Sequence, residues 1–164
     1  MTDNNIIKLN KDNILRLKIE TSEGELTGEE LVFDLEDIEL PLKYQELLEK
    51  DKKNKENIRN QLVIIEKRQD VKGKKLLSEN EEDKIKALNE FFNKQVEIYN
   101  MFLGDNGVQK LLNGRKLGWT ALQEIDEIIE KQIAPYLDIN MKQITDKVKE
   151  KYKQASNEEI EVVK

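Results

Sequence analysis

The chain has 164 residues, a length typical of one domain, and its charged residues (38%) slightly outnumber its hydrophobic ones (37%). This balance is typical of long amphipathic helices with solvated outer faces. Because the chain contains no cysteine and no histidine, disulfides, thiolate metal sites and thiol catalysis are excluded, and the commonest general base and metal ligand are missing. The net charge of −6 argues against direct binding of nucleic acid.

No stretch of the sequence has the hydrophobicity of a membrane span or a signal peptide. The longest uninterrupted apolar run covers only residues 62–65, which is far too short to cross a bilayer. The opening residues, MTDNNIIKLNKD, lack the apolar stretch of a signal peptide. We therefore expect a cytoplasmic protein without membrane contact.

Two segments near the N-terminus alternate apolar and polar residues, the pattern of half-buried β-strands. The first is NILRLKIET and the second is ELVFDLED, and the polar, glycine-bearing SEGELTGE between them suits a hairpin loop. From Glu20 to Leu42 there are nine acidic residues and no basic one. We interpret this acidity either as charge that keeps a hairpin edge solvated or as an acidic docking surface.

The next segment predicts a helix that begins at Pro41. Its apolar residues form two groups: Leu40, Tyr44, Leu47 and Leu48 near the start, and Ile58, Leu62 and Ile65 near the end. Because residues 51–57 include no apolar side chain, the pattern fits one long helix or two helices joined at this stretch.

A central helix has the strongest amphipathic pattern in the chain, and we expect it to form the core. Ser78 and Glu81 have the spacing of a capping box at its start. Gly104 follows the last periodic residue, where a left-handed cap favours glycine. The apolar residues recur at helical spacing: Ile85, Leu88, Phe92, Val96, Tyr99, and Phe102 or Leu103.

Four of the seven glycines lie in FLGDNGVQKLLNGRKLGWT, residues 102–120, which raises the question of a phosphate-binding loop. The spacing does not fit a P-loop, since Gly107 and Gly114 are seven positions apart and Arg115 follows. The Asp105-Asn106-Gly107 turn also lacks the ligand spacing of a calcium loop. We interpret the glycines as corners that fold a short helix back between two longer ones.

Two further helices are predicted after these corners. The first starts at Trp119, which we expect to be buried against Phe102 or Leu112, and ends before Pro135. The second runs from about residue 139 to residue 154, with Asp138 as its N-cap.

The predicted fold is α+β, mainly α, with an N-terminal β-hairpin followed by a bundle of four to five helices. We divide the chain into the hairpin region (residues 1–38), a helical domain that packs with the hairpin as one unit (39–155) and a flexible tail (156–164).

Carboxylates are the remaining catalytic candidates. Asp126 and Glu130 are four positions apart on one helix, and so are Glu79 and Asp83. Such pairs are common on charged helical faces and need a convergent pocket to act. The Glu-x-x-His pattern of di-iron bundles requires histidine. We therefore expect a protein that is not an enzyme and has no catalytic residues, metal or cofactor.

Three segments resemble small phage and prophage proteins of Gram-positive bacteria that are regarded as tail assembly chaperones of long-tailed phages. They are VFDLEDIELPLKYQELLEK, ALNEFFNKQVEIYNMFLGDNGVQKLLNG and WTALQEIDEIIEKQI, and the resemblance covers roughly residues 32–152. It implies binding to the tape-measure protein, a long helical phage protein with exposed apolar stretches, until the tail tube polymerises around it. It also implies contact with tail-tube subunits, and no catalytic residues. A programmed frameshift often makes a second, longer product in that class.

Two other functions fit the same sequence. A phage-encoded inhibitor of a host protein or defence complex would act through the acidic surface of residues 20–39. A structural interaction module would belong to the virion itself.

We expect self-association, with residues 44–65 as the candidate interface. A helical client such as the tape-measure protein would need an apolar groove, which we expect on the helices that flank the central one. The candidate partner-binding residues form two faces: Ile58, Leu62 and Ile65, and Ile144, Val148 and Tyr152.

Overall fold

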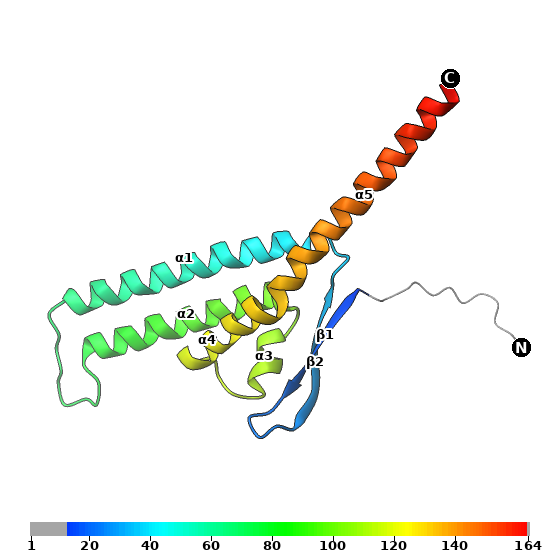
Figure 1. The fold of residues 1–164 in the computed structure, drawn as a ribbon. Helices are drawn as coiled ribbons and strands as arrows, with labels where there is room; N and C mark the ends of the chain where they lie inside the picture. Colours follow the sequence, from blue (N-terminus) through cyan, green and yellow to red (C-terminus); the bar gives the residue numbers. More distant parts are fainter. Residues whose placement is uncertain (1–12, 164) are drawn as a thin grey trace, which may run out of the picture.

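The structure, a computed structural model, has an N-terminal antiparallel hairpin followed by helices, which confirms the α+β, mainly α, prediction (Figure 1). It describes residues 13–163, so the N-terminal segment in which a signal peptide was sought lies outside the described part. Within that part the elements are β1 (Ile14–Glu20), β2 (Leu26–Asp34), α1 (Leu40–Lys67), α2 (Glu79–Leu103), α3 (Gly107–Leu112), α4 (Trp119–Ile128), the π-helical turn η1 (Ile129–Ile133) and α5 (Ala134–Val163).

The hairpin is stabilised by the helices on which it packs. Leu17 of β1 pairs with Leu31 of β2, and the alternation places Ile19, Leu31 and Phe33 in the core. The ring of Phe33 lies 5.6 Å, centroid to centroid, from that of Phe102 in α2. Because an isolated two-stranded hairpin is only marginally stable, this packing holds the two strands in place.

The first long helix is continuous. α1 has 28 residues, with Pro41 in its first turn as predicted, and it runs antiparallel and side by side with α2 (Figure 1). Its polar middle, residues 51–57, is therefore helical and does not join two helices. Asn54, in the centre of that stretch, is only 5% exposed.

The start and end of α2 match the sequence pattern. Ser78 accepts a hydrogen bond from the Glu81 amide, and Glu81 accepts one from the Ser78 amide, which completes the predicted capping box. Gly104 ends the helix with φ +96°, a conformation that favours glycine.

The buried face of α2 is rotated relative to the predicted stripe. Ile85, expected in the core, is 52% exposed, whereas Phe91, Gln95 and Ile98 are buried. The reason is that α1 covers α2 along most of its length, so the side toward α1 is buried whether its residues are apolar or polar.

The glycine-rich segment folds the short helix α3 back against α2. A Cβ added to Gly107 would lie 2.6 Å from the Cβ of Leu103, closer than two side-chain carbons can approach. The absence of a side chain at Gly107 therefore permits the close approach of α3 to α2. This agrees with the interpretation of the segment as a set of corners.

The expectation that Pro135 ends a helix is wrong. The chain continues without a break from α4 through η1 into α5, with Pro135 in the first turn of α5 and Asp138 inside it, where it cannot act as an N-cap. A proline lacks an amide hydrogen and its ring crowds the preceding turn. The wider π-helical turn immediately before Pro135 changes the hydrogen-bond register and accommodates the ring.

The last helix is also longer than predicted. α5 extends to Val163, beyond the expected end at residue 154 and through most of the predicted tail. In the view of Figure 1 it leaves the body beside the start of α1 and projects away from it. No helix among residues 13–163 is long and apolar enough to cross a membrane.

Candidate functional site

The first predicted partner-binding face, on α1, is part of the core. Ile58 and Ile65 are 8% and 7% exposed, and Leu62 is half-buried against the core. This changes the expectation for these residues, because α1 and α2 pair along this stretch and leave no open groove at the face. The neighbouring Val63 and Ile64 are the exposed apolar residues of this part of α1.

The second predicted face, on α5, is open. Val148 and Tyr152 are 51% and 75% exposed, and Ile144 is half-buried. All three lie on the part of α5 that projects from the body (Figure 1). The structure therefore separates the two faces: one contributes to folding and the other remains accessible.

The prediction that Trp119 is buried is wrong. Its side chain is 57% exposed, and the apolar residues that fix the start of α4 in the core are Leu117 and Leu122. Trp119 is the first residue of α4. An exposed tryptophan fits the alternative role of a binding hot spot, where this residue type is enriched.

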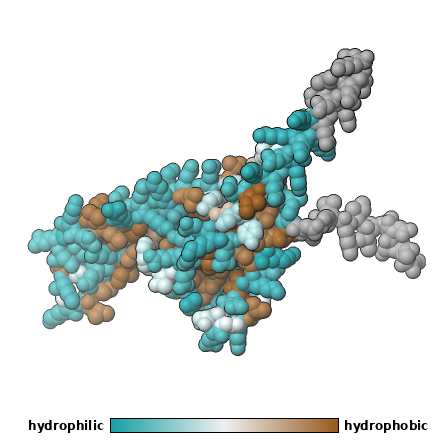
Figure 2. Space-filling view, in the orientation of Figure 1, coloured by the Kyte–Doolittle hydropathy of each residue, from teal (hydrophilic) through white to brown (hydrophobic). Residues whose placement is uncertain are grey.

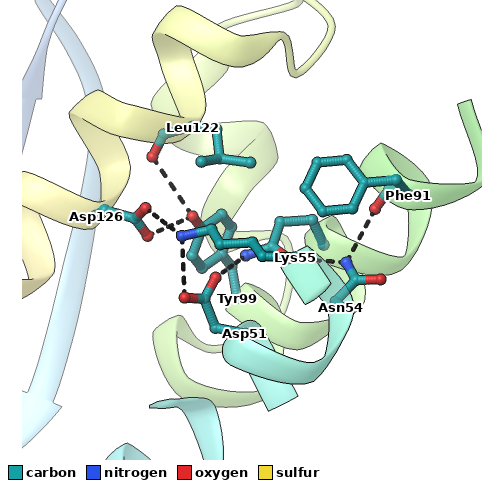
Figure 3. A network of polar contacts seen from close by, with 8 residues as sticks. Asp51, Asn54, Lys55, Phe91, Tyr99, Leu122 and Asp126 are labelled. Carbon is teal, nitrogen blue, oxygen red and sulfur yellow. Dashed lines mark hydrogen bonds and ion pairs between the residues drawn. The ribbon is translucent and has the colours of Figure 1, made fainter. Parts of the chain in front are cut away.

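A network of polar side chains links α1, α2 and α4 (Figure 3). The Lys55 ammonium on α1 lies 3.0 Å from a carboxylate oxygen of Asp51 and 2.8 Å from one of Asp126 on α4. The Tyr99 hydroxyl on α2 donates to the other oxygen of Asp126 at 2.5 Å. Asp126 thus receives a charge-assisted hydrogen bond from each of the two long helices.

The network continues into the α1–α2 interface. Gln95, which is fully buried, donates to Asp51 at 2.5 Å and accepts from the Asn54 side chain at 2.9 Å. Asn54 also donates to the backbone carbonyl of Phe91 at 3.2 Å. No buried side-chain nitrogen or oxygen in the described part of the chain lacks a partner. A fully satisfied network of this kind fixes how neighbouring helices pack.

The environment of the network keeps its protons in place. Burial, together with the hydrogen bond to Asp126, raises the pKa of the Tyr99 hydroxyl far above its ordinary value. Burial alone would lower the pKa of Lys55, but the hydrogen bonds and charges of Asp126 and Asp51 outweigh it and raise that pKa. At neutral pH the Tyr99 hydroxyl stays protonated and Lys55 stays charged, so neither is activated as a nucleophile or base.

A pocket of about 340 Å³ opens beside this network. Asp126 and Glu130, the carboxylate pair noted in the sequence, both line it. Tyr44 forms another part of the wall, and its pKa is raised by burial and by the negative charge of Glu130. Asp126 is already engaged by Lys55 and Tyr99, so its main role is to hold α4 against α1 and α2.

Sequence reasoning missed the network because it counted only apolar residues. The signal was the spacing: Asp51 and Asn54 continue, at intervals of three and four, the stripe that runs from Leu47 to Ile58. Polar residues that occupy the buried positions of a long helix predict a polar interface. Gln95 occupies the equivalent position between Phe91 and Ile98 on α2.

Exposed apolar side chains gather at the end of the molecule where α1 is connected to α2, which we call the tip (Figure 2). Leu76 in the connecting loop is 88% exposed and Ile64 is 63% exposed. The tip cluster consists of Val63, Ile64, Val71, Leu76 and Ile85. Single exposed apolar residues are ordinary, but several at one end indicate a binding surface.

No protein-family model, curated protein or solved structure matches this chain. Within residues 13–163, no three acidic side chains are arranged to hold a metal ion.

Proposed function

We propose that this chain is a non-enzymatic tail assembly chaperone of a long-tailed phage. It acts in the host cytoplasm, where it binds the tape-measure protein and contacts tail-tube subunits before the tail is complete. The observation that carries the proposal is the tip cluster, an apolar surface left open on a protein whose described buried polar groups are all satisfied.

The segments that resemble tail assembly chaperones support a division of labour. They form the end of β2, the first part of α1, most of α2, α3, α4 and η1. These elements contribute the packed body and include most of its core. The tip lies between the first two segments, in residues 51–86, which outside α1–α2 pairing contribute little to the core. A shared body with a variable tip is what a family of chaperones with different clients requires.

The charges around the tip indicate which helices it binds. Residues 67–75 contain five basic side chains and one acidic one, Asp70. A client helix with apolar residues at i, i+3, i+4 and i+7 and acidic residues beside them would match this surface. The apolar stripe supplies affinity, and the flanking charges orient the helix.

Co-expression with the tape-measure protein of the same phage tests the proposal. The double variant Ile64→Asp and Leu76→Asp should fold, since both side chains are exposed, but should no longer co-purify with the client. The matched control is Leu26→Asp with Val32→Asp, which introduces the same charges at exposed apolar positions of the hairpin and should retain the client.

The other outcomes contradict parts of the proposal. If the unmodified chain does not bind the tape-measure protein, the chaperone function is wrong. If the tip variant binds as well as the unmodified chain, the client does not use the tip. If the hairpin variant alone loses the client, the acidic hairpin is the docking surface.

A further inference from the structure

One face of α5 passes without interruption from the core into solvent. Its residues recur at intervals of three and four, so they lie on the same side of the helix. Ile133, immediately before α5, is fully buried and Leu137 is 6% exposed, whereas Met141 is 38%, Val148 is 51% and Tyr152 is 75% exposed. The stripe that packs α5 onto the body therefore continues for at least 15 residues beyond Ile133 with a decreasing share of its surface covered.

This part of α5 also carries a charge that is opposite to that of the body beside it. Residues 142–153, which we call the arm, contain five lysines and two carboxylates. Residues 20–42, which form most of the hairpin and the start of α1, contain nine carboxylates and no basic residue. In one molecule the arm projects away from that region (Figure 1), so the two charges do not neutralise each other.

We propose that a second copy of the chain covers the arm, with the two α5 helices packed antiparallel. A two-fold axis beside Ile144 brings Met141 of each copy near Val148 of the other. The basic end of each arm then lies over the acidic base of its partner. A parallel pair would instead place the two basic arms side by side, where like charges repel.

The base of α5 offers a place for the end of the partner's arm. A groove of about 440 Å³ lies between the start of α1 and α5, and its apolar lining includes Leu42, Leu48 and Met141. Leu42 is 65% exposed and Leu48 is 48% exposed. In the antiparallel pair Tyr152 reaches the level of residue 136 of the other copy, next to this groove. The aromatic ring of Tyr152, with no apolar neighbour in its own copy, would fill it.

The interface is isologous, because each copy contributes the same arm and the same groove. It differs from the predicted interface at residues 44–65, most of whose apolar residues pack inside one copy. It is also independent of the chaperone function and of the tip, so either proposal can fail alone.

Sedimentation of the full chain over a range of concentrations tests the pairing. We expect dimers, and we expect Ile144→Asp with Val148→Asp to weaken the dimer at least 30-fold or abolish it, because it places four carboxylates in the shared stripe. The matched control is Ile139→Asp with Gln143→Asp, which adds the same charge on the opposite side of α5 and should remain dimeric. A strict monomer at millimolar concentration, or a dimer that the stripe variant leaves intact, would overturn the proposal.

The direction of the two helices has its own measurement. Because the chain has no cysteine, Lys153→Cys gives a single attachment point for a nitroxide spin label. Position 153 lies nine residues from the axis at Ile144, so the two labels in an antiparallel dimer are separated by about 27 Å along the helices at 1.5 Å per residue. A parallel pair places them about 10 Å apart, the usual distance between packed helices. The shorter distance would refute the antiparallel arrangement even if the protein is dimeric.

Discussion

The Tyr99→Phe substitution removes a single hydrogen-bond donor from the network between α1, α2 and α4. Tyr99 is 1% exposed, and its hydroxyl lies 2.5 Å from Asp126 and 3.4 Å from the carbonyl oxygen of Leu122. Phenylalanine keeps the ring and its packing, so the change leaves only the volume of one oxygen atom unfilled.

The cost follows from the partners that remain. A hydrogen bond to a charged group contributes about 1.5–3 kcal/mol. Asp126 keeps its contact with Lys55, and its side chain is 34% exposed, so water can replace part of the lost bond. We therefore expect the free energy of unfolding to fall by about 1.5–2 kcal/mol at neutral pH. For a chain of this length that corresponds to a Tm lower by about 3–8 °C.

The same substitution has a distinct effect at high pH. The pKa of Tyr99 is raised in the folded protein above its unfolded value of about 10, so the folded state keeps the proton when the unfolded state loses it. This contribution is present below pH 10 and is lost as pH rises above it, by about 1.4 kcal/mol per pH unit. Lys55, whose pKa is also raised from 10.5, changes stability in the same direction but is present in both proteins. The difference in stability between the unmodified chain and Tyr99→Phe should therefore shrink above pH 10.

Urea unfolding followed by circular dichroism at 222 nm, at pH 7 and at pH 11, measures both effects. Tyr136→Phe is the matched control, because Tyr136 is 47% exposed and should be insensitive to the loss of its hydroxyl. If Tyr99→Phe changes stability by less than about 0.5 kcal/mol at neutral pH, the Tyr99–Asp126 bond does not hold the three helices together. A difference that grows above pH 10 would contradict the assigned direction of the pKa shift.

Three further predictions concern the core and its boundary. Ile65→Asp should destabilise the fold by at least about 4 kcal/mol, because it buries an unpaired charge, whereas Ile64→Asp at the exposed neighbouring position should change stability by less than about 0.5 kcal/mol in the same urea titration. Gly107→Ala should cost about 1–3 kcal/mol through its clash with Leu103, while Gly118→Ala, which meets no atom within 4 Å, should be neutral; equal Tm values for both would contradict the close approach. Trp119 should emit at long wavelength and be quenched by acrylamide, and Trp119→Ala should cost less than about 1 kcal/mol; a blue-shifted, protected signal would show that the ring is buried.

The sequence was sufficient to predict the elements whose signals are local. The hairpin alternation, Pro41 at the start of α1, the capping box at Ser78 and the cap at Gly104 each depend on residues within a few positions of one another. The result at Gly107 also agrees with the sequence, although the reason is specific. The position is constrained by the neighbouring helix, which a sequence pattern indicates only as a concentration of glycines.

The wrong expectations concern how elements meet. Trp119 was expected in the core because it is large and apolar, but the direction of the first turn of α4 decides its exposure. Pro135 was expected to end a helix because it lacks an amide hydrogen, but η1 absorbs that defect within a continuous helix. The partner faces illustrate the same point, since Ile65 and Val148 have equivalent spacing in their helices and opposite exposure.

The comparison between α1 and α5 explains why spacing alone cannot locate a binding face. A helical stripe identifies which residues share a side of the helix, and both α1 and α5 have one. Whether the stripe is core or surface depends on how far the neighbouring helix extends beside it. α2 accompanies α1 to its end, as the ion pair between Glu66 and Lys84 shows, whereas the body beside α5 stops near Leu137 and the stripe goes on. The residues past that point keep an apolar pattern that their own copy does not use, and it is this surplus, together with the opposite charges of arm and base, that indicates a partner.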